Sequence, residues 1–172
     1  MDNSLKETKI SSQKIYDGKL LHLEKDSVTL PNGNTADREL IRHVGAVCMV
    51  PLLDNGEIIL EKQYRYPVEK TIIEIPAGKL NSPDEDRLSA AKRELQEETG
   101  YTAEKWTDIG LYYPAAAYSD EKITIYLAEG LKKGECNLDE DEFLEVITMP
   151  LGEAVDKIVS GEIADGKTQA AV

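Results

Sequence analysis

The first part of the chain alternates short apolar runs with turn residues, a pattern typical of antiparallel strands. Three strand-like runs lie between Ser12 and His43. So small a sheet buries little apolar surface alone, and we expect it to pack on the main body or on a second copy of the chain. The apolar run from Gly45 to Leu53 and the run from Glu57 to Tyr66 flank the hairpin turn Asp54-Asn55-Gly56. We expect these two runs to be central strands of one larger sheet.

A helix with clear boundary signals follows a short strand at residues 71–76. Ser82 can cap its N-terminus, Pro83 suits the first helical position, and Glu85 three residues after Ser82 completes a capping box. Gly100 is suited to the C-terminal cap. The apolar stripe lies on a different side of the helix from its glutamates and consists of Leu88, Ala91 and Leu95.

The last part of the chain predicts three strands and two helices. The strand-like runs cover residues 106–113, 122–131 and 143–149. Pro150 is expected to open an amphipathic helix, and the tail from Ala164 has the pattern of the start of a last helix.

Composition narrows the class of protein. With 172 residues the chain has the size of a single domain. Its net charge of −13 argues against nonspecific binding to nucleic acids or anionic membranes, which basic patches drive. No apolar run has the roughly 20 residues of a membrane helix, and the polar N-terminus lacks the core of a signal peptide, so we expect a cytoplasmic protein. Cys48 and Cys136 lack metal-ligand spacing, and a buried Cys48 thiol is favoured over a disulfide.

Candidate chemistry is concentrated between Arg93 and Glu98. In a helix, Glu94, Glu97 and Glu98 stand at i, i+3 and i+4, so their carboxylates project from one face. Like charges there repel one another unless a cation lies among them, and Arg93 supplies part of that positive charge. Oxygen ligands on one face also suit Mg²⁺ or Mn²⁺. The residues alone leave two interpretations open, a solvated acidic face and a metal site.

The same stretch resembles the Nudix box, the pattern Gx5Ex7REUxEExGU in which U is an aliphatic or similar residue. The matching residues are Glu85, Arg93, Glu94, Leu95, Glu97, Glu98, Gly100 and Tyr101. So many defined positions at fixed spacing make the match specific. One departure is that six residues separate Gly78 from Glu85, where the family pattern has five. The extra residue falls in the loop ahead of the predicted helix.

The resemblance extends from about residue 12 over nearly the whole chain and is to the ADP-ribose pyrophosphatase branch. It is carried by Arg38-Glu39, the strand at Gly45, Gln63-Tyr64-Arg65, Glu74 to Gly78, and Glu142 to Val146. It implies an α/β fold, the Nudix α/β/α sandwich with a mixed sheet, plus a small N-terminal antiparallel β subdomain. Residues 1–43 would form that subdomain and join two copies into a homodimer, and residues 44–172 would form the hydrolase domain.

By this resemblance the protein is a metal-dependent hydrolase of a nucleoside diphosphate derivative, with ADP-ribose giving AMP and ribose 5-phosphate as the expected reaction. Mg²⁺ or Mn²⁺ is the implied cofactor, because a divalent cation neutralises the diphosphate and acidifies a bound water. Glu94, Glu98 and the backbone carbonyl of Ala77 would bind the first metal. Glu97 would share a further one, and Arg93 would hold the carboxylates in place by charge-assisted hydrogen bonds.

Three acidic positions have more than one interpretation. By the resemblance Glu85 would belong to the metal network, and by its position it would be a capping residue. These two interpretations do not exclude each other. In the related enzymes the base that activates water is a glutamate on a loop after the box. Glu142 matches that position best and Glu140 comes second. A solvated acidic loop is the alternative for both.

The resemblance also indicates residues that bind the substrate. Arg65 and Arg38 match positions that contact the pyrophosphate or neighbouring groups, with Arg38 reaching across the dimer. A plain surface arginine is the alternative for Arg38. Glu74 is assigned to the same site, and Ser119 and Asp120 would line its ribose end.

Two other functions stay open at this point. A noncatalytic nucleotide-sensing Nudix domain would not need three helix glutamates, and all three are present. A hydrolase of another nucleoside diphosphate sugar, or of a dinucleotide such as NADH or FAD, would keep the chemistry and change the substrate. The residues that raise this last alternative are the alanines at 115–117, where the branch usually carries Ser-Pro-Gly.

Overall fold

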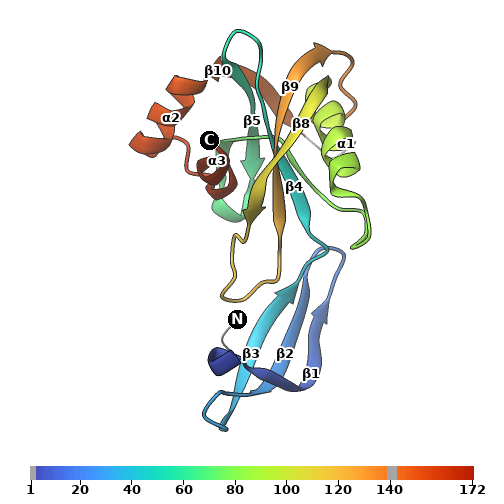
Figure 1. Cartoon of the computed structure of the whole chain (residues 1–172), viewed down its shortest axis with the longest axis vertical. Helices are drawn as coiled ribbons and strands as arrows, with labels where there is room; N and C mark the ends of the chain where they lie inside the picture. The colour runs from blue at the N-terminus through green and yellow to red at the C-terminus, as the bar shows by residue number, and fades with distance from the viewer. Residues whose placement is uncertain (1–2, 139–142) are drawn as a thin grey trace.

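The structure is a computed structural model that describes residues 3–138 and 143–172 (Figure 1). Its strands are β1 (Thr8–Asp17), β2 (His22–Thr29), β3 (Thr35–Arg42), β4 (Ala46–Pro51), β5 (Glu57–Arg65), β6 (Lys70–Glu74), β7 (Ala77–Lys79), β8 (Tyr101–Tyr112), β9 (Ile123–Lys133) and β10 (Leu144–Pro150). Its helices are η1 (Asn3–Leu5), η2 (Tyr66–Val68), α1 (Arg87–Thr99), α2 (Leu151–Ser160) and α3 (Gly166–Ala171).

The predicted N-terminal sheet is confirmed. β1, β2 and β3 form an antiparallel sheet that projects from the rest of the chain (Figure 1). Every residue of β1 is exposed, including the apolar side chains of Ile10, Ile15 and Tyr16. Within one protomer this sheet therefore leaves apolar surface uncovered.

The body contains two sheets where one larger sheet was expected. β4 belongs to a four-stranded sheet of order β7-β4-β9-β8, and β5 lies between β10 and β6 in a second sheet. The hairpin turn forms as predicted, with the Leu53 N–H donating to the Glu57 carbonyl at 2.8 Å. Pairing between the strands stops at the single bridge from Leu52 to Ile58. The expectation of one larger sheet is wrong, because the turn leads the chain from one sheet into the other.

The four-stranded sheet is mixed and buried on both faces. β4 runs parallel to β9. β7 pairs antiparallel with β4, and β8 pairs antiparallel with β9. Alternate residues of β4 point to opposite faces, so Cys48 packs with Ile58 of the second sheet and Met49 packs with Leu95 of α1. α1 covers one face, and α2 and α3 lie on the other side of the body (Figure 1). This arrangement confirms the α/β fold with a mixed sheet.

The N-terminus of α1 differs from the sequence prediction. The helix begins at Arg87, one turn later than expected, and Asp86 is its N-cap. The Asp86 side chain accepts a hydrogen bond from the Ser89 N–H at 2.8 Å, which satisfies a donor of the first turn. The assignment of Ser82 as N-cap and Pro83 as first helical residue is therefore wrong.

The other helix ends agree with the sequence. Gly100 caps α1 with φ of 74°, and its N–H donates to the Gln96 carbonyl at 2.9 Å. Pro150 directly precedes α2, and the predicted last helix is α3, which Asp165 caps.

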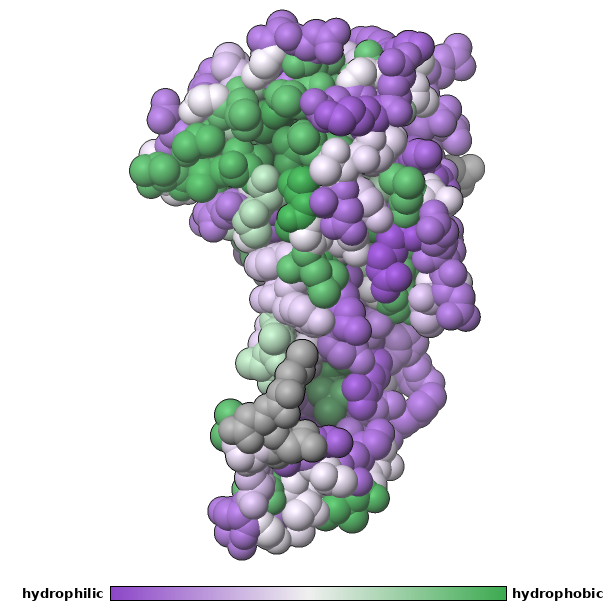
Figure 2. Space-filling model, viewed as in Figure 1, coloured by the Kyte–Doolittle hydropathy of each residue, from purple (hydrophilic) through white to green (hydrophobic). Residues whose placement is uncertain are grey.

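Apolar side chains also gather on the surface of the body. Figure 2 shows a continuous hydrophobic area at the upper left, over α2. Leu151, Val155 and Val159 are exposed there at successive turns of the helix. Among the described residues, no helix has the length and apolar content needed to cross a membrane.

Candidate functional site

Two glutamates of α1 turn inward toward β7. Glu94 and Glu98 lie one turn apart and are only 9% and 6% exposed. Leu95, between them in sequence, is fully buried and fixes the helix against β4. The Glu98 Oε2 accepts a hydrogen bond from the Ala77 N–H at 3.1 Å. Packing of the helix therefore brings its carboxylates to the backbone of β7.

Gly78 makes this close approach possible. A Cβ atom at this position would lie 1.9 Å from the Cδ atom of Glu94, which is far inside van der Waals contact. Only glycine leaves room for the carboxylate to rest against the strand backbone. The carboxylates of Glu94 and Glu98 thus converge on residues 77–78.

Arg93 stands among the carboxylates, as the spacing predicted. Its Nη1 lies 2.7 Å from Oε1 of Glu94 and 3.0 Å from Oε2 of Glu97. Its Nη2 lies 3.4 Å from Oε1 of Glu85. Burial lowers the pKa of Arg93, but the charges of Glu94 and Glu97 outweigh burial and raise this pKa above its ordinary value. One guanidinium faces three carboxylates, so the group keeps an excess of negative charge.

Glu85 belongs to the loop before α1 and does not cap the helix. Its Oε2 accepts a hydrogen bond from the Asn81 N–H at 2.5 Å. This bond, and then the charge of Arg93, lower the pKa of Glu85. Glu85 therefore ties the loop to Arg93, and the capping-box interpretation is wrong.

A second charged cluster joins β5, β6 and α3. Arg65 holds Glu74 with two parallel bonds, from Nε to Oε1 at 2.8 Å and from Nη2 to Oε2 at 3.0 Å. Lys167 of α3 contacts the same Oε2, and its Nζ lies 3.2 Å from Asp165. Burial lowers the pKa of Arg65, but Glu74 more than compensates and raises it. Here two cations balance two carboxylates, and the Glu74 carboxylate contacts both cations.

Ser119 and Asp120, assigned to the ribose end, lie at the junction between the N-terminal sheet and the body. The Asp120 carboxylate accepts hydrogen bonds from the His43 N–H at 2.8 Å and from Arg42 Nη1 at 3.1 Å. The Ser119 Oγ accepts one from the Glu121 N–H at 3.2 Å. The Asp120 side chain holds the loop after β8 against the end of β3, whereas the Ser119 side chain bonds within that loop.

The remaining assigned residues are not gathered with the glutamates. Arg38 lies on β3, in the N-terminal sheet, and its guanidinium binds both carboxylate oxygens of Glu7 at 2.9 and 2.5 Å. The structure does not bring Arg38 to α1 within one protomer (Figure 1). Glu140 and Glu142 lie outside the described residues.

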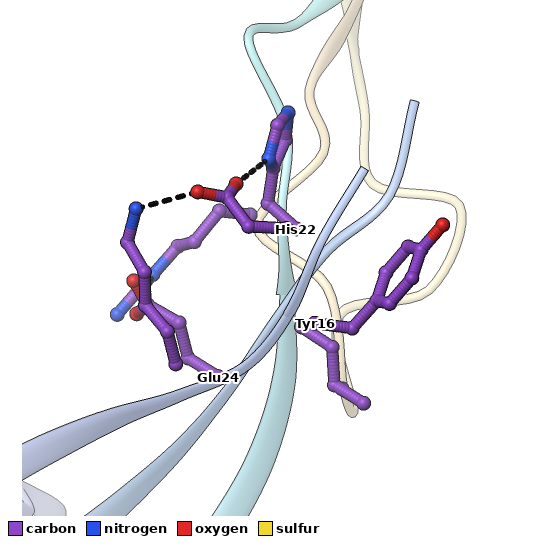
Figure 3. A pocket seen from close by; sticks show the side chains of 7 residues that line it. Tyr16, His22 and Glu24 are labelled. Atoms are coloured by element: carbon purple, nitrogen blue, oxygen red, sulfur yellow. Dashed lines mark hydrogen bonds and ion pairs between the residues drawn. The ribbon is translucent and has the colours of Figure 1, made fainter. Parts of the chain in front are cut away.

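A cavity of about 220 Å³ lies apart from both clusters, at the end of the N-terminal sheet near the body (Figure 3). Its lining residues are Lys14, Tyr16, Asp17, His22, Leu23, Glu24 and Arg42. Asp17 binds both Lys14 and His22, at 2.8 and 2.5 Å. None of the residues that the sequence assigned to a site lines this cavity.

Comparison with known proteins agrees with this geometry. A family model described as the NUDIX domain matches residues 42–168. The chain belongs to the Nudix hydrolase family. A model of the nucleoside diphosphate sugar hydrolase N-terminal domain matches residues 7–41.

Several known proteins are similar to this chain over almost all of its length. It is 44% identical over 171 residues to the ADP-ribose pyrophosphatase of Bacillus subtilis (strain 168), covering 98% of this chain and 92% of that protein. It is 41% identical over 174 residues to the methanol dehydrogenase activator of Bacillus methanolicus, covering 100% and 94%. A crystal structure of an ADP compounds hydrolase has a TM-score of 0.85 at 26% identity and covers 96% of this chain and 90% of that one.

The donor chemistry of this Nudix site fits a hard divalent cation, on which Nudix hydrolases in general depend. Glu94 and Glu98 supply carboxylate oxygens, and the missing side chain of Gly78 brings one of them against backbone. Among residues 3–138 and 143–172 no three His, Cys, Asp or Glu side chains already form a metal-binding group. Arg93 instead bridges Glu94 and Glu97.

Sequence reasoning missed the members of the second cluster that come from α3. Asp165, Lys167 and Thr168 were identified only as part of a last helix. The spacing of Asp165 and Thr168 is an N-cap signal, and it could have located the helix start. The sequence around α3 carries no signal of its contact with Glu74, which lies 93 positions before Lys167.

Proposed function

We propose that this Nudix protein hydrolyses the pyrophosphate bond of ADP-ribose, giving AMP and ribose 5-phosphate. The proposal is supported by the 44% identity to an ADP-ribose pyrophosphatase along 98% of the chain. The structural observation that carries it is the convergence of Glu94 and Glu98 on the backbone at Gly78. Arg65 adds a cation whose pKa is raised first by Glu74 and to a smaller extent by the charge of Glu98, so groups for a metal and for an anion occur together.

Each group has a distinct part in this proposal. A bound divalent cation would neutralise the charge of the diphosphate and lower the pKa of a water molecule. Glu94, Glu98 and the Ala77 carbonyl would hold Mg²⁺ or Mn²⁺, and Glu97 would help to hold a further ion. Arg93 positions two of these carboxylates, and Arg65 binds the diphosphate.

The base that takes a proton from the attacking water is assigned to Glu142, with Glu140 as the second choice. Both assignments rest on the family resemblance, since neither residue is described. The chain after them enters β10 at Leu144, which pairs with Gln63 of β5. Arg65 follows two residues later on the same strand, so this part of the chain leads to the anion-binding side of the site.

We also propose a homodimer joined through residues 1–43, with residues 44–172 as the hydrolase domain. The uncovered apolar side chains of β1 support this arrangement. Arg38 would then contact the substrate of the partner copy, and Ser119 and Asp120 would line the ribose end. Sedimentation equilibrium tests the dimer, and a monomer at micromolar concentration would contradict it.

A second candidate is hydrolysis of another nucleoside diphosphate sugar or of a dinucleotide such as NADH or FAD. It is favoured by the alanines at 115–117 and by the match of residues 7–41 to the nucleoside diphosphate sugar hydrolase N-terminal domain. The catalytic groups would be unchanged, and only the contacts beyond the diphosphate would differ.

One experiment separates these candidates. The protein is incubated with Mg²⁺ or Mn²⁺ and, in parallel, ADP-ribose, GDP-mannose, NADH and FAD, and the mononucleotide products are quantified. We expect AMP from ADP-ribose at the highest kcat/KM. Faster turnover of another member would replace the proposed substrate. Binding without turnover of any member, with metal present, would favour a nucleotide-sensing domain.

A further inference from the structure

The buried carboxylate of Glu74 joins a residue near the substrate to the C-terminal helix. Its side chain is 2% exposed, whereas the Arg65 side chain is 43% exposed, so Arg65 is the member of the pair that can meet a ligand. We propose that Lys167, acting through Glu74, is a positioning residue that keeps positive charge available on Arg65 and so sets the affinity for the diphosphate. This inference rests on the proposed function.

The contact between Lys167 and Glu74 is part of a network of hydrogen bonds. The Asp165 side chain accepts bonds from the Thr168 N–H at 2.9 Å and from its hydroxyl at 2.6 Å. The Thr168 Oγ1 in turn accepts the Ile75 N–H at 2.9 Å, and Thr168 is fully buried. Glu74, the last residue of β6, and Ile75 directly after it are therefore anchored to one turn of α3. The Lys167 ammonium is held in register with the Glu74 carboxylate.

The charge balance explains why a second cation is needed. Without Lys167, the Arg65 guanidinium would stand with the carboxylates of Glu74 and Asp165, and the net negative charge would repel an anion. Lys167 shares an oxygen of Glu74 with Arg65 and lies 3.2 Å from Asp165, so two cations balance two carboxylates. Thr168 donates two hydrogen bonds to Asp165 and holds this carboxylate beside Lys167. Arg65 is the more accessible of the two cations, because Lys167 has an exposed side-chain fraction of only 12%.

Lys167→Met tests the inference, with Lys157→Met as the matched control. Lys157 lies on α2 and pairs with Glu153 and Glu162, away from the Glu74 cluster. Binding of ADP-ribose is measured by calorimetry in EDTA, where no turnover occurs, and KM and kcat are measured with Mg²⁺. We expect Kd and KM to rise on the order of tenfold for Lys167→Met, with kcat changed less than about threefold. Lys167→Arg and the control should stay near wild type.

A double variant separates charge from structure. Glu74→Gln combined with Lys167→Met restores the net charge of the cluster, so its Kd should return to within about threefold of wild type. A merely structural role predicts a double variant at least as impaired as the two single variants together. If Lys167→Met does not fold, the double variant is compared with Glu74→Gln alone, which has one more positive charge and should bind more tightly.

The outcomes distinguish this inference from the proposed function. Failure of the wild type to bind or cleave ADP-ribose contradicts the proposed substrate, and the same variants are then compared with inorganic pyrophosphate as the probe. Wild-type affinity of Lys167→Met for the bound probe would overturn the role of Lys167. A double variant whose Kd does not recover would overturn this role as well.

Discussion

The two charged clusters of the body have different charge balances. Around Arg93, one guanidinium faces the carboxylates of Glu85, Glu94 and Glu97. Around Glu74, the cations Arg65 and Lys167 balance the carboxylates of Glu74 and Asp165. The first group keeps negative charge and suits a metal ion, and the second is neutral and leaves the Arg65 guanidinium accessible to a phosphate. A chain with a net charge of −13 can therefore bind an anion where local cations offset the carboxylates.

The clusters are connected by a very short piece of chain. Glu74 ends β6, and Ala77 and Gly78, which meet the helix carboxylates, follow within four residues. Anchoring of Glu74 and Ile75 by α3 thus also restrains the backbone at the metal side. The two halves of the site therefore share one backbone segment while keeping separate charged groups.

Removing a carboxylate from the acidic cluster should have the largest effect. Glu98→Gln keeps the size of the side chain but weakens a proposed metal ligand. We expect turnover to fall on the order of 10²- to 10⁴-fold with little change in thermal stability. Steady-state kinetics with Mg²⁺ and a melting curve measure the two effects. Glu153→Gln on the surface of α2 is the control, and activity of Glu98→Gln close to this control would refute the metal assignment.

Removing the arginine of each cluster should change how stability responds to Mg²⁺ in different ways. Arg93→Met leaves three carboxylates without their shared partner, and we expect a loss of about 1–3 kcal/mol in the free energy of unfolding without metal. Millimolar Mg²⁺ should restore part of it. Arg65→Met should show no such recovery, since Glu74 keeps Lys167. Urea unfolding with and without Mg²⁺ measures both free energies. Equal recovery in both variants would contradict the proposed difference between the clusters.

The smallest expected effect is the response of Glu85 to acid. Its pKa is lowered from the ordinary 4.5, first by the Asn81 N–H and then by Arg93. A lowered native pKa contributes stability above about pH 4.5 that is lost as the pH falls through the native value. Glu85→Gln should therefore be less stable than wild type near neutral pH, by less than about 1 kcal/mol, and the difference should shrink below pH 4.5. Parallel stability curves down to pH 3 would contradict this.

The acidic cluster could be predicted because its members are close in sequence. Helical spacing alone places Glu94, Glu97 and Glu98 near one another and puts Arg93 within reach. The cap at Gly100 followed from the same local reasoning. The burial of Glu94 did not, because it depends on a glycine of another strand that lies 16 positions earlier.

The start of α1 was misplaced because two residues compete for the same role. Ser82, followed by a proline and then by Glu85, satisfies every local requirement of an N-cap. Asp86 is an equally good cap, and the Glu85 carboxylate is engaged by Asn81 and Arg93. Tertiary contacts of the loop therefore decide between two candidate N-cap residues of similar propensity.

Contacts between residues far apart in the chain could not be predicted from the sequence. The turn at residues 54–56 shows that β4 and β5 are antiparallel neighbours at their ends, but it cannot show whether their ladder continues. The contact of Lys167 with Glu74 likewise leaves no local signal. Both depend on which strands the body assembles side by side.

The positions of the paired residues along the chain also suggest an order of folding. Arg93 is separated from Glu94 and Glu97 by one and four positions, so these contacts can form as soon as α1 forms. Lys167 must close a loop of 93 residues to reach Glu74, and Thr168 must do the same to reach Ile75. Long-range closure is slow and entropically costly. In refolding experiments we therefore expect the capacity to bind metal to return before the capacity to bind the diphosphate.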